Sequence, residues 1–316
     1  MPKITGEAIG VDVGGLRLKA VRIRRNEDGT IVRRSEHVET LRPEDRAPDA
    51  MQEKLTALFW SLGAKTPLPC GLAIPGGVRQ PDGVVTQAPN FPDWREFDIR
   101  ARLEAELGVP VAVDNDANMH TYAEWVAGAG RDTESLLGVF LGTGVGGGLI
   151  LDGQLYRGRR GIAGEVGHVV LHPAGEPCGC GARGCLEQYA STLFLLREAR
   201  RLDHPAVQNS EPAECGRRLA VAARGGDGDA MQLFHALGTN LGTGLAGILN
   251  VLDVEALVIG GGLVQAWDLF ADALEQTLRA RLYDAIAADL GLLRAECGDS
   301  AAAVGAACFA LDSSRD

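Results

Sequence analysis

One histidine and three cysteines stand close together in the sequence and form a possible donor set for a metal: His168, Cys178, Cys180 and Cys185. Three thiolates and one imidazole suit a closed, tetrahedral and therefore structural Zn2+ site. Glycines separate the cysteines, which favours a loop wrapped around an ion over a chance cluster of buried cysteines. We expect this segment to bind zinc.

Two glutamates lie beside this motif. Glu165 precedes His168 by three positions, and Glu187 follows Cys185 by two. A loop ordered by a metal would hold both carboxylates in place, where they suit hydrogen bonds from a polyhydroxylated ligand. Two ordinary surface glutamates are the alternative interpretation.

A second candidate for chemistry is the pair Asn115 and Asp116, which follows an apolar segment, residues 109–113, that reads as a buried strand. Open α/β sheets bind ligands at the carboxyl ends of their strands. Asp116 is placed to accept the proton of a substrate hydroxyl while that oxygen attacks a phosphoryl group. Capping of a helix that begins at Ala117 is the alternative, and one carboxylate can serve both purposes.

Three glycine turns follow predicted strands, at Gly14-Gly15, Gly142 to Gly148 and Gly260 to Gly262. Turns without Cβ atoms let phosphate oxygens approach backbone N–H groups. None fits G-x-x-x-x-G-K-[ST], or G-x-G-x-x-G between a strand and a helix, so the P-loop and Rossmann classes are disfavoured. Asp12, just before the first turn, suits a phosphate-bound Mg2+ held through water, or else caps the turn.

Predicted strands alternate with predicted helices along the chain, and these elements must position the candidate groups. The alternation predicts an α/β fold with a mostly parallel sheet. A hairpin is expected at 8–23, and a similar strand, glycine turn and strand at 137–151 favours two related α/β domains. Residues 203–215, with Pro205 and Pro212, are expected to form a surface loop. The other predicted elements are strands at 70–74 and 256–259, helices at 48–62, 99–107, 117–127 and 269–282, and mainly helices from 188 to 249.

The composition is that of an ordinary globular protein: hydrophobic residues make up 46% and charged residues 23% of 316 positions. Lys and Arg number 31 against 42 Asp and Glu, a net charge of -11, which disfavours a nucleic-acid partner.

Because no apolar run could span a membrane and the start lacks signal-peptide features, we expect a cytoplasmic protein without membrane association. The other cysteines read as small buried residues: Cys70, Cys215, Cys297 and Cys308.

Together these segments make the sequence resemble the ROK family, the group of bacterial sugar kinases, related repressors and open reading frames. The resemblance runs from Ile9 to Ala307. The cysteine loop is its most family-specific part. The segments that carry it are DVGG at 12–15, AIPG at 73–76, APNFPDW at 88–94, NDAN at 115–118, LGTGVGGG at 141–148, GEVGH at 164–168, CGCGARGCLE at 178–187 and IGGG at 259–262.

The resemblance implies an actin-like ATPase (ribonuclease H-like) fold, in which two α/β domains enclose a cleft. A small α/β domain would comprise residues 1–114 and 300–316, and a large α/β domain with the zinc loop would comprise residues 115–299. The C-terminal helix would return to the first domain. The resemblance also implies a homodimer or homotetramer.

The family's functional residues map onto this sequence one by one. Asp116 matches the general base, which also contacts the sugar. Positions that hold sugar hydroxyls match Gly76, Asn90, Asn115, Glu165, His168 and Glu187, with His168 also a zinc ligand. The nucleotide turns match Gly14, Gly15, Thr143, Gly144, Gly261 and Gly262, with Asp12 and Arg17 beside the first turn. The implied reaction transfers the γ-phosphoryl group of ATP, with Mg2+, to a hexose hydroxyl, with O6 of glucose as the expected acceptor.

The sequence departs from the family's kinases at one point, since they usually carry a small hydroxyl residue after the first glycine pair and this chain has Leu16 and then Arg17. Backbone amides and the charge of Arg17 remain for a phosphate. Three alternatives follow: a kinase that uses polyphosphate or another sugar, a sugar-binding protein with weak or no activity, and a regulator. Regulators of the family carry an additional N-terminal helix-turn-helix, which we do not expect because the first glycine turn arrives at Gly14.

Overall fold

The computed structural model describes residues 4–63, 67–208, 210 and 212–314. The chain has mixed α and β structure, as the alternating sequence pattern predicts. It separates into two compact units, the first comprising residues 1–138, 148–164 and 296–316 and the second residues 139–147 and 165–295. This grouping assigns residues 115–138 to the first unit, while the expected domain limits at 114 and 300 stay a prediction.

The first unit is built on a five-stranded sheet with the order β3-β2-β1-β4-β7. The first three strands are antiparallel neighbours, whereas β4 and β7 run parallel to β1. The prediction of a mostly parallel sheet is therefore wrong for this sheet, which is mixed because short turns join β1, β2 and β3. The predicted hairpin at 8–23 and the predicted strand at 70–74 are confirmed. The strands are β1 (Gly6–Val13), β2 (Arg17–Arg25), β3 (Ile31–Thr40), β4 (Cys70–Ile74) and β7 (Val111–Asn115).

Strand β7 begins and ends two residues later than the segment 109–113 that the apolar run predicts. Asn115 therefore pairs with Ile74 at the end of the sheet. The following helix, α3 (Asp116–Ala127), begins at once. Asn115 and Asp116 thus stand at the junction of a strand and a helix.

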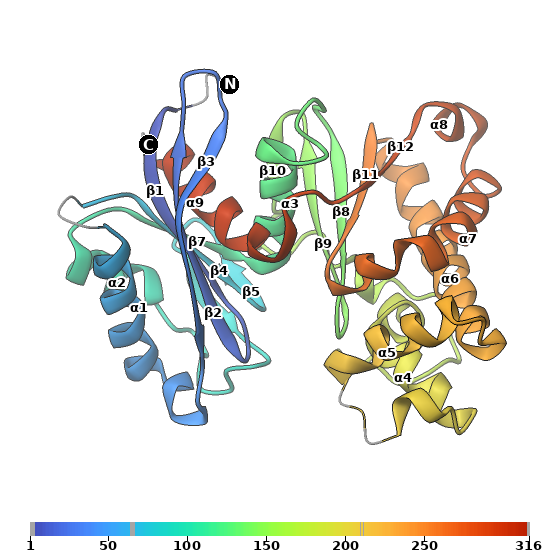
Figure 1. Cartoon of the computed structure of the whole chain (residues 1–316). Coiled ribbons are helices and arrows are strands. Elements are labelled where there is room, and N and C mark those ends of the chain that lie inside the picture. Colours follow the sequence, from blue (N-terminus) through green and yellow to red (C-terminus); the bar gives the residue numbers. More distant parts are fainter. Residues whose placement is uncertain (1–3, 64–66, 209, 211, 315–316) are drawn as a thin grey trace. The chain divides into compact units, whose positions relative to one another are not determined.

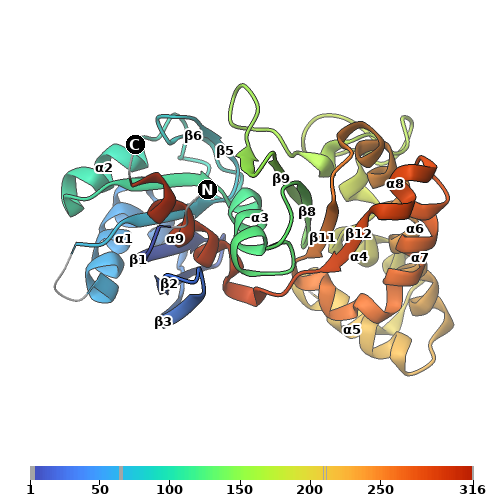
Figure 2. The ribbon, with the colours of Figure 1, turned by 90° about the horizontal axis from the view of Figure 1, so that it is seen from above.

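Four helices cover this sheet (Figure 1 and Figure 2). α1 (Pro48–Gly63) and α2 (Ile99–Leu107) lie on one face, and α3 and α9 (Ala301–Ser313) lie on the other. α2 begins where the Asp98 side chain accepts from the N–H of Ala101, and it ends at Gly108 in the left-handed conformation. The predicted helices at 48–62, 99–107 and 117–127 are confirmed.

The C-terminal helix α9 lies unusually close to the central strands. A Cβ on Gly10 of β1 would lie 1.9 Å from the carbonyl oxygen of Ala303, and one on Gly71 of β4 would lie 2.0 Å from that of Ala306. Glycines on the strands and alanines on the helix permit this approach. The last helix therefore packs on the first unit, as the family resemblance implies.

The second large sheet has the order β10-β9-β8-β11-β12. Its strands β8 (Leu136–Leu141) and β9 (Val145–Leu151) are joined by the glycine turn, which confirms the pattern predicted at 137–151. β10 (Gln154–Tyr156) pairs antiparallel with β9, and β11 (Ala256–Gly260) pairs parallel with β12 (Gly291–Arg294). A separate two-stranded sheet joins β5 (Gly77–Arg79) and β6 (Val84–Gln87).

The second unit is rich in helices, as predicted, and α6 packs along α7 (Figure 1). The surface loop predicted at 203–215 is wrong at its end, because α5 begins at Pro212, where the missing N–H of proline costs a helix nothing. Cys215, in that helix, is buried. The helices are α4 (Thr192–Arg201), α5 (Pro212–Arg224), α6 (Gly228–Leu252), α7 (Trp267–Arg279) and α8 (Asp284–Asp289).

The scattered cysteines follow expectation at three of four positions, since Cys70, Cys215 and Cys308 are buried and Cys297 is only half-buried.

Among the helices that the structure describes, none combines the length and the apolar character that a membrane span requires.

Candidate functional site

The junction of β7 and α3 brings together predicted site residues from the ends of two parallel strands. Asn115 donates from Nδ2 to the carbonyl of Gly76, which follows β4, over 3.0 Å. Its Oδ1 accepts from the N–H groups of Ala117, at 2.8 Å, and Asn118, at 3.2 Å. The capping role therefore belongs to Asn115, which keeps one Nδ2 hydrogen for a ligand.

Asp116 is the first residue of α3 and is half-buried. Its carboxylate accepts from the N–H of Ala117 over 2.9 Å. The N-terminal end of a helix stabilises negative charge. A carboxylate held in this way at the end of a strand has the chemistry of a general base for a hydroxyl group.

Asn90 lies against the first glycine turn. A Cβ on Gly15 would be 2.9 Å from the side chain of Asn90. The N–H of Gly14 donates to the carbonyl of Arg17 over 2.9 Å, which closes the turn between β1 and β2. A predicted sugar contact and a predicted nucleotide turn are thus neighbours within the first unit.

The side chains of Leu16 and Asp12 lie at the first turn, where a phosphate or a cation bound to it is expected. Leu16 is 66% exposed at the tip, where it presents hydrocarbon instead of a hydroxyl. Burial raises the pKa of Asp12 to about 6, against the opposing effect of the Lys19 charge, which lies across the hairpin. The carboxylate is therefore ionised at neutral pH, as binding to a cation requires.

The second unit gathers the four predicted zinc ligands. One ligand atom from each of His168, Cys178, Cys180 and Cys185 lies within 4.8 Å of the others. The sulfurs of Cys180 and Cys185 are 3.7 Å apart, and that of Cys178 is 3.6 Å from Nδ1 of His168. A tetrahedral zinc with bonds of about 2.3 Å to sulfur separates its sulfur ligands by about 3.8 Å. The spacing fits zinc, whose presence stays a prediction.

Both predicted glutamates reach this cluster. Oε2 of Glu165 is 3.8 Å from Nε2 of His168, and Oε1 of Glu187 is 3.8 Å from Nδ1. The thiol of Cys178 donates to the same Glu187 oxygen over 2.9 Å. The Nδ1 edge of His168 therefore faces the thiols, while the Nε2 edge faces Glu165 and is available for another polar group.

The second and third glycine turns are neighbours within this unit. A Cβ on Gly144 would lie 2.6 Å from Oε2 of Glu187, so the cluster of His168 and the three cysteines adjoins the second turn. Gly261, with φ +84°, packs so closely on β8 that a Cβ there would lie 2.4 Å from the carbonyl oxygen of Leu141. Only glycine combines this conformation with this approach.

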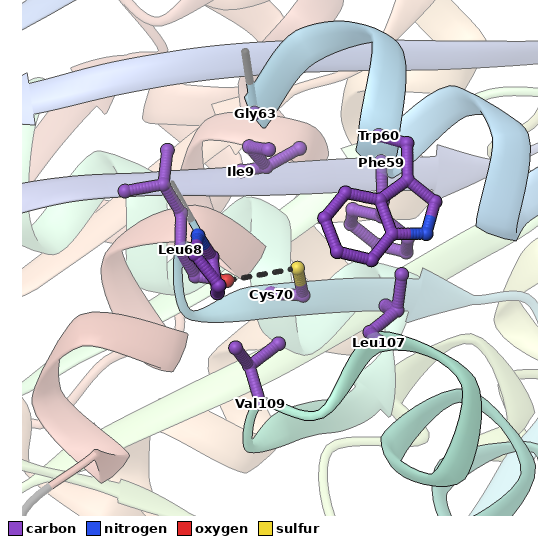
Figure 3. A pocket seen from close by; sticks show the side chains of 9 residues that line it. Ile9, Phe59, Trp60, Gly63, Leu68, Cys70, Leu107 and Val109 are labelled. Atoms are coloured by element: carbon purple, nitrogen blue, oxygen red, sulfur yellow. Dashed lines mark hydrogen bonds between the residues drawn. The ribbon is translucent and has the colours of Figure 1, made fainter. Parts of the chain in front are cut away.

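An apolar hollow beside α1 holds none of these residues (Figure 3). Cys70 there donates to the carbonyl of Leu68 over 3.1 Å, and burial raises the pKa of its thiol to about 12. A neutral thiol among hydrocarbon groups supplies neither charge nor a base. The hollow is lined by Ile9, Phe59, Trp60, Gly63, Pro67, Leu68, Cys70, Leu107 and Val109.

Asp114 was not among the predicted site residues, and its side chain is fully buried at the end of β7. It accepts from Arg157 and from Asn118, and it also accepts from the N–H of Asn115. The signal that could have found it is a charged residue inside a strand, directly after the apolar residues 111–113, because buried carboxylates require partners.

The sequence profile of the ROK family matches residues 8–313. The chain belongs to this family. The glucokinase of Streptomyces coelicolor is 33% identical over 305 residues, which are 90% of this chain and 94% of that protein. The xylose repressor of Bacillus subtilis is 28% identical over 314 residues, which are 98% of this chain and 78% of the repressor. ROK relatives of this chain thus include both a kinase and a repressor.

A crystal structure of a ROK family glucokinase from Streptomyces griseus, in complex with glucose and AMPPNP, matches this ROK chain with a TM-score of 0.79 at 31% identity. The match covers 96% of this chain and 99% of the other. The fold is accordingly the actin-like ATPase (ribonuclease H-like) fold that the resemblance implies.

Proposed function

We propose that this ROK protein catalyses the ATP-dependent phosphorylation of a hexose, converting glucose to glucose 6-phosphate. The observation that carries the proposal is the carboxylate of Asp116 at the junction of β7 and α3, next to Asn115. The likeness to glucokinases over nearly the whole chain supports the sugar and the donor.

In this proposal Asp116 accepts the proton of the sugar O6 hydroxyl as that oxygen attacks the γ-phosphorus of ATP, and ADP leaves with the electrons of the broken P–O bond. Carboxylate and amide groups suit the remaining hydroxyls, because sugar hydroxyls both donate and accept. We assign sugar contacts to Gly76, Asn90, Asn115, Glu165, His168 and Glu187.

The glycine turns would bind the nucleotide through backbone N–H groups. When bound, Mg2+ supplies positive charge to the phosphates of ATP. Asp12, ionised at neutral pH, is suited to hold it through water. The turn residues assigned to the nucleotide are Gly14, Gly15, Arg17, Thr143, Gly144, Gly261 and Gly262.

We propose a structural role for zinc in this chain. The Cys3His donor set is complete, so no ligand position is left for a substrate. The four side chains would cross-link a loop that has little regular structure, and they would fix Glu165 and Glu187, which touch His168 and Cys178. We also propose assembly as a homodimer or homotetramer, which light scattering measures.

The proposal is tested with purified protein, Mg-ATP and a panel of glucose, mannose, fructose and N-acetylglucosamine, with ADP release and sugar phosphate measured separately. Glucose is expected to give the highest kcat/KM with ATP. Turnover with polyphosphate but not with ATP would show that the phosphoryl donor is polyphosphate. A higher kcat/KM with another sugar would show that this sugar is the acceptor. ADP release without sugar phosphate would contradict the proposal.

A sugar-binding protein without useful kinase activity is the second candidate, and the observation that favours it is Leu16 in place of a hydroxyl residue at the nucleotide turn. This candidate predicts calorimetric binding of a sugar with no phosphorylation by any donor in the panel. The kinase proposal predicts both binding and turnover.

A further inference from the structure

The buried carboxylate of Asp114 lies at the centre of a network around the base of α3. Its Oδ1 accepts from the N–H of Asn115 over 2.7 Å and from Nδ2 of Asn118 over 2.8 Å. Its Oδ2 accepts from Nε of Arg157 over 2.5 Å and from Nε2 of Gln80 over 3.5 Å. The side chain is fully buried, so every one of these bonds forms away from bulk water.

Two of these bonds bracket the proposed base. Asn115 directly precedes Asp116, and Asn118 lies within the first turn of α3. Asn115 also caps the helix through its own side chain. One carboxylate therefore ties the chain on both sides of Asp116, and its position restricts how far that residue can shift or rotate.

Arg157 supplies the positive charge in this network. It follows β10, and its guanidinium lies 4.6 Å from the centroid of the Phe309 ring on α9. Its side chain is 22% exposed, against 1% for Asp114. A buried carboxyl group without partners is strongly disfavoured, so the pairing with Arg157 offsets the burial of the Asp114 side chain at this position. The ring holds the arginine in turn.

We propose that Arg157 is a positioning residue: through Asp114 it fixes the turn from Asn115 to Asn118 and thereby the orientation of Asp116. The inference rests on the proposed function, in which Asp116 is the base. Arg157 touches no reacting atom in this account. Its effect is therefore expected in kcat and, because Asn115 is a proposed sugar contact, to a smaller extent in the KM for the sugar, whereas binding of ATP stays nearly unchanged.

The test compares Arg157→Met and Arg157→Lys with the wild type. Arg157→Met is expected to lower kcat about 10- to 100-fold, because small displacements of a catalytic group have effects of this size, with a smaller rise in the KM for the sugar and the KM for ATP within about twofold. Arg157→Lys keeps the charge and is expected to recover part of the loss. The double variant, Arg157→Met with Asp114→Asn, removes the arginine together with the carboxylate that it pairs with. Its kcat is expected to be no lower than that of the slower of the two single variants, Arg157→Met and Asp114→Asn.

The matched control is Arg102→Met. Arg102 also lies over a phenylalanine ring, at 5.0 Å from the centroid of Phe97, and also pairs with a carboxylate, that of Asp49, at 2.7 Å. It does not touch the β7–α3 junction. This control is expected to change kcat by less than about twofold. An equal loss in the Arg102 and Arg157 variants would overturn the inference.

A second measurement separates this inference from the proposed function. Hydrogen exchange of peptides that cover residues 114–120 is expected to be faster in Arg157→Met than in the wild type, with other peptides of the sheet unchanged. Faster exchange in a protein that phosphorylates no sugar would refute the proposed function but keep the positioning of the turn. An active wild type with unchanged exchange and kcat in Arg157→Met would overturn the positioning role.

Discussion

The carboxyl group of Asp12 is desolvated where β1 enters the first glycine turn, and this burial raises its pKa to about 6 from an ordinary value of 3.8. Because the pKa is higher in the folded state than in the unfolded state, ionisation of Asp12 lowers the stability of the fold. This loss of stability grows as the pH rises from about 4 to 6 and has its full size above pH 6. The charge is retained where a phosphate-bound cation is expected.

Asp12→Asn is therefore expected to stabilise the protein at pH 7.5 by up to about 3 kcal/mol, from the difference between the two pKa values. The gain should shrink at pH 5, and the KM for ATP should rise. Urea unfolding at both pH values measures the stability, with Asp132→Asn as an exposed control. A variant that is less stable than the wild type at pH 7.5 would contradict the account.

Leu16→Thr restores a hydroxyl at the exposed tip of the same turn. One new hydrogen bond to a phosphate is worth about 0.5–1.5 kcal/mol, so the KM for ATP is expected to fall about 2- to 10-fold while the KM for sugar stays constant. Leu16→Ala removes the leucine without adding a hydroxyl and is the control. Identical ATP kinetics for the two variants would show that the missing hydroxyl is unimportant.

At the scale of elements, the closeness of α9 to the central strands is open to a direct test. Gly71→Ala would place a methyl group 2.0 Å from the carbonyl of Ala306, so helix or strand must move. Overpacking of this kind costs about 1–3 kcal/mol. Gly228→Ala, at the start of α6 with open space around it, is expected to be neutral or slightly stabilising. Urea midpoints that are equal for the two variants would contradict this packing.

The cysteine loop is expected to carry about one zinc per chain, measured by metal analysis of protein purified without chelator. Cys180→Ser should lose most of that metal and lower the apparent unfolding temperature. Gly179→Ala, a neighbour with open space around it, should keep the metal. Zinc-free wild-type protein, or a Cys180→Ser variant that retains zinc fully, would refute the site.

The two strands of the first hairpin were predictable from sequence, and the edge strand beside them was not. β1 contains a run of four buried residues, β2 largely alternates buried residues with less buried ones, and a glycine pair separates the two strands, which is a local signal. β3 has almost only exposed side chains and lies at the edge of the sheet, so no pattern marks it. The end of β7 was missed by two residues because Asp114 and Asn115 are polar, although backbone pairing with β4 continues through them.

The same distinction applies to the candidate site. The four candidate metal ligands are close in sequence, and their spacing was sufficient to predict that they would meet. Arg157 and Asp114 are 43 positions apart, and their pairing depends on how β10 follows β9 in the second sheet. Local patterns contain no information about such a contact. The roles of Asp116 and the sugar-binding residues stay predictions.

At the scale of the whole molecule, the relatives of this chain include both a kinase and a repressor. The net charge of -11 opposes binding to a phosphate backbone. The charge therefore favours a small-molecule ligand over DNA for this ROK protein.

The most direct test of the central claim measures glucose 6-phosphate formation from Mg-ATP by wild type, Asp116→Asn and Asp98→Asn, with glucose binding measured by calorimetry on the same samples. Asp98→Asn is the matched control because it makes the same change at the N-cap of α2. The account predicts that Asp116→Asn binds glucose normally but loses about 100- to 10,000-fold in kcat, whereas the control is unaffected. An Asp116→Asn variant that forms glucose 6-phosphate at the wild-type rate would contradict it.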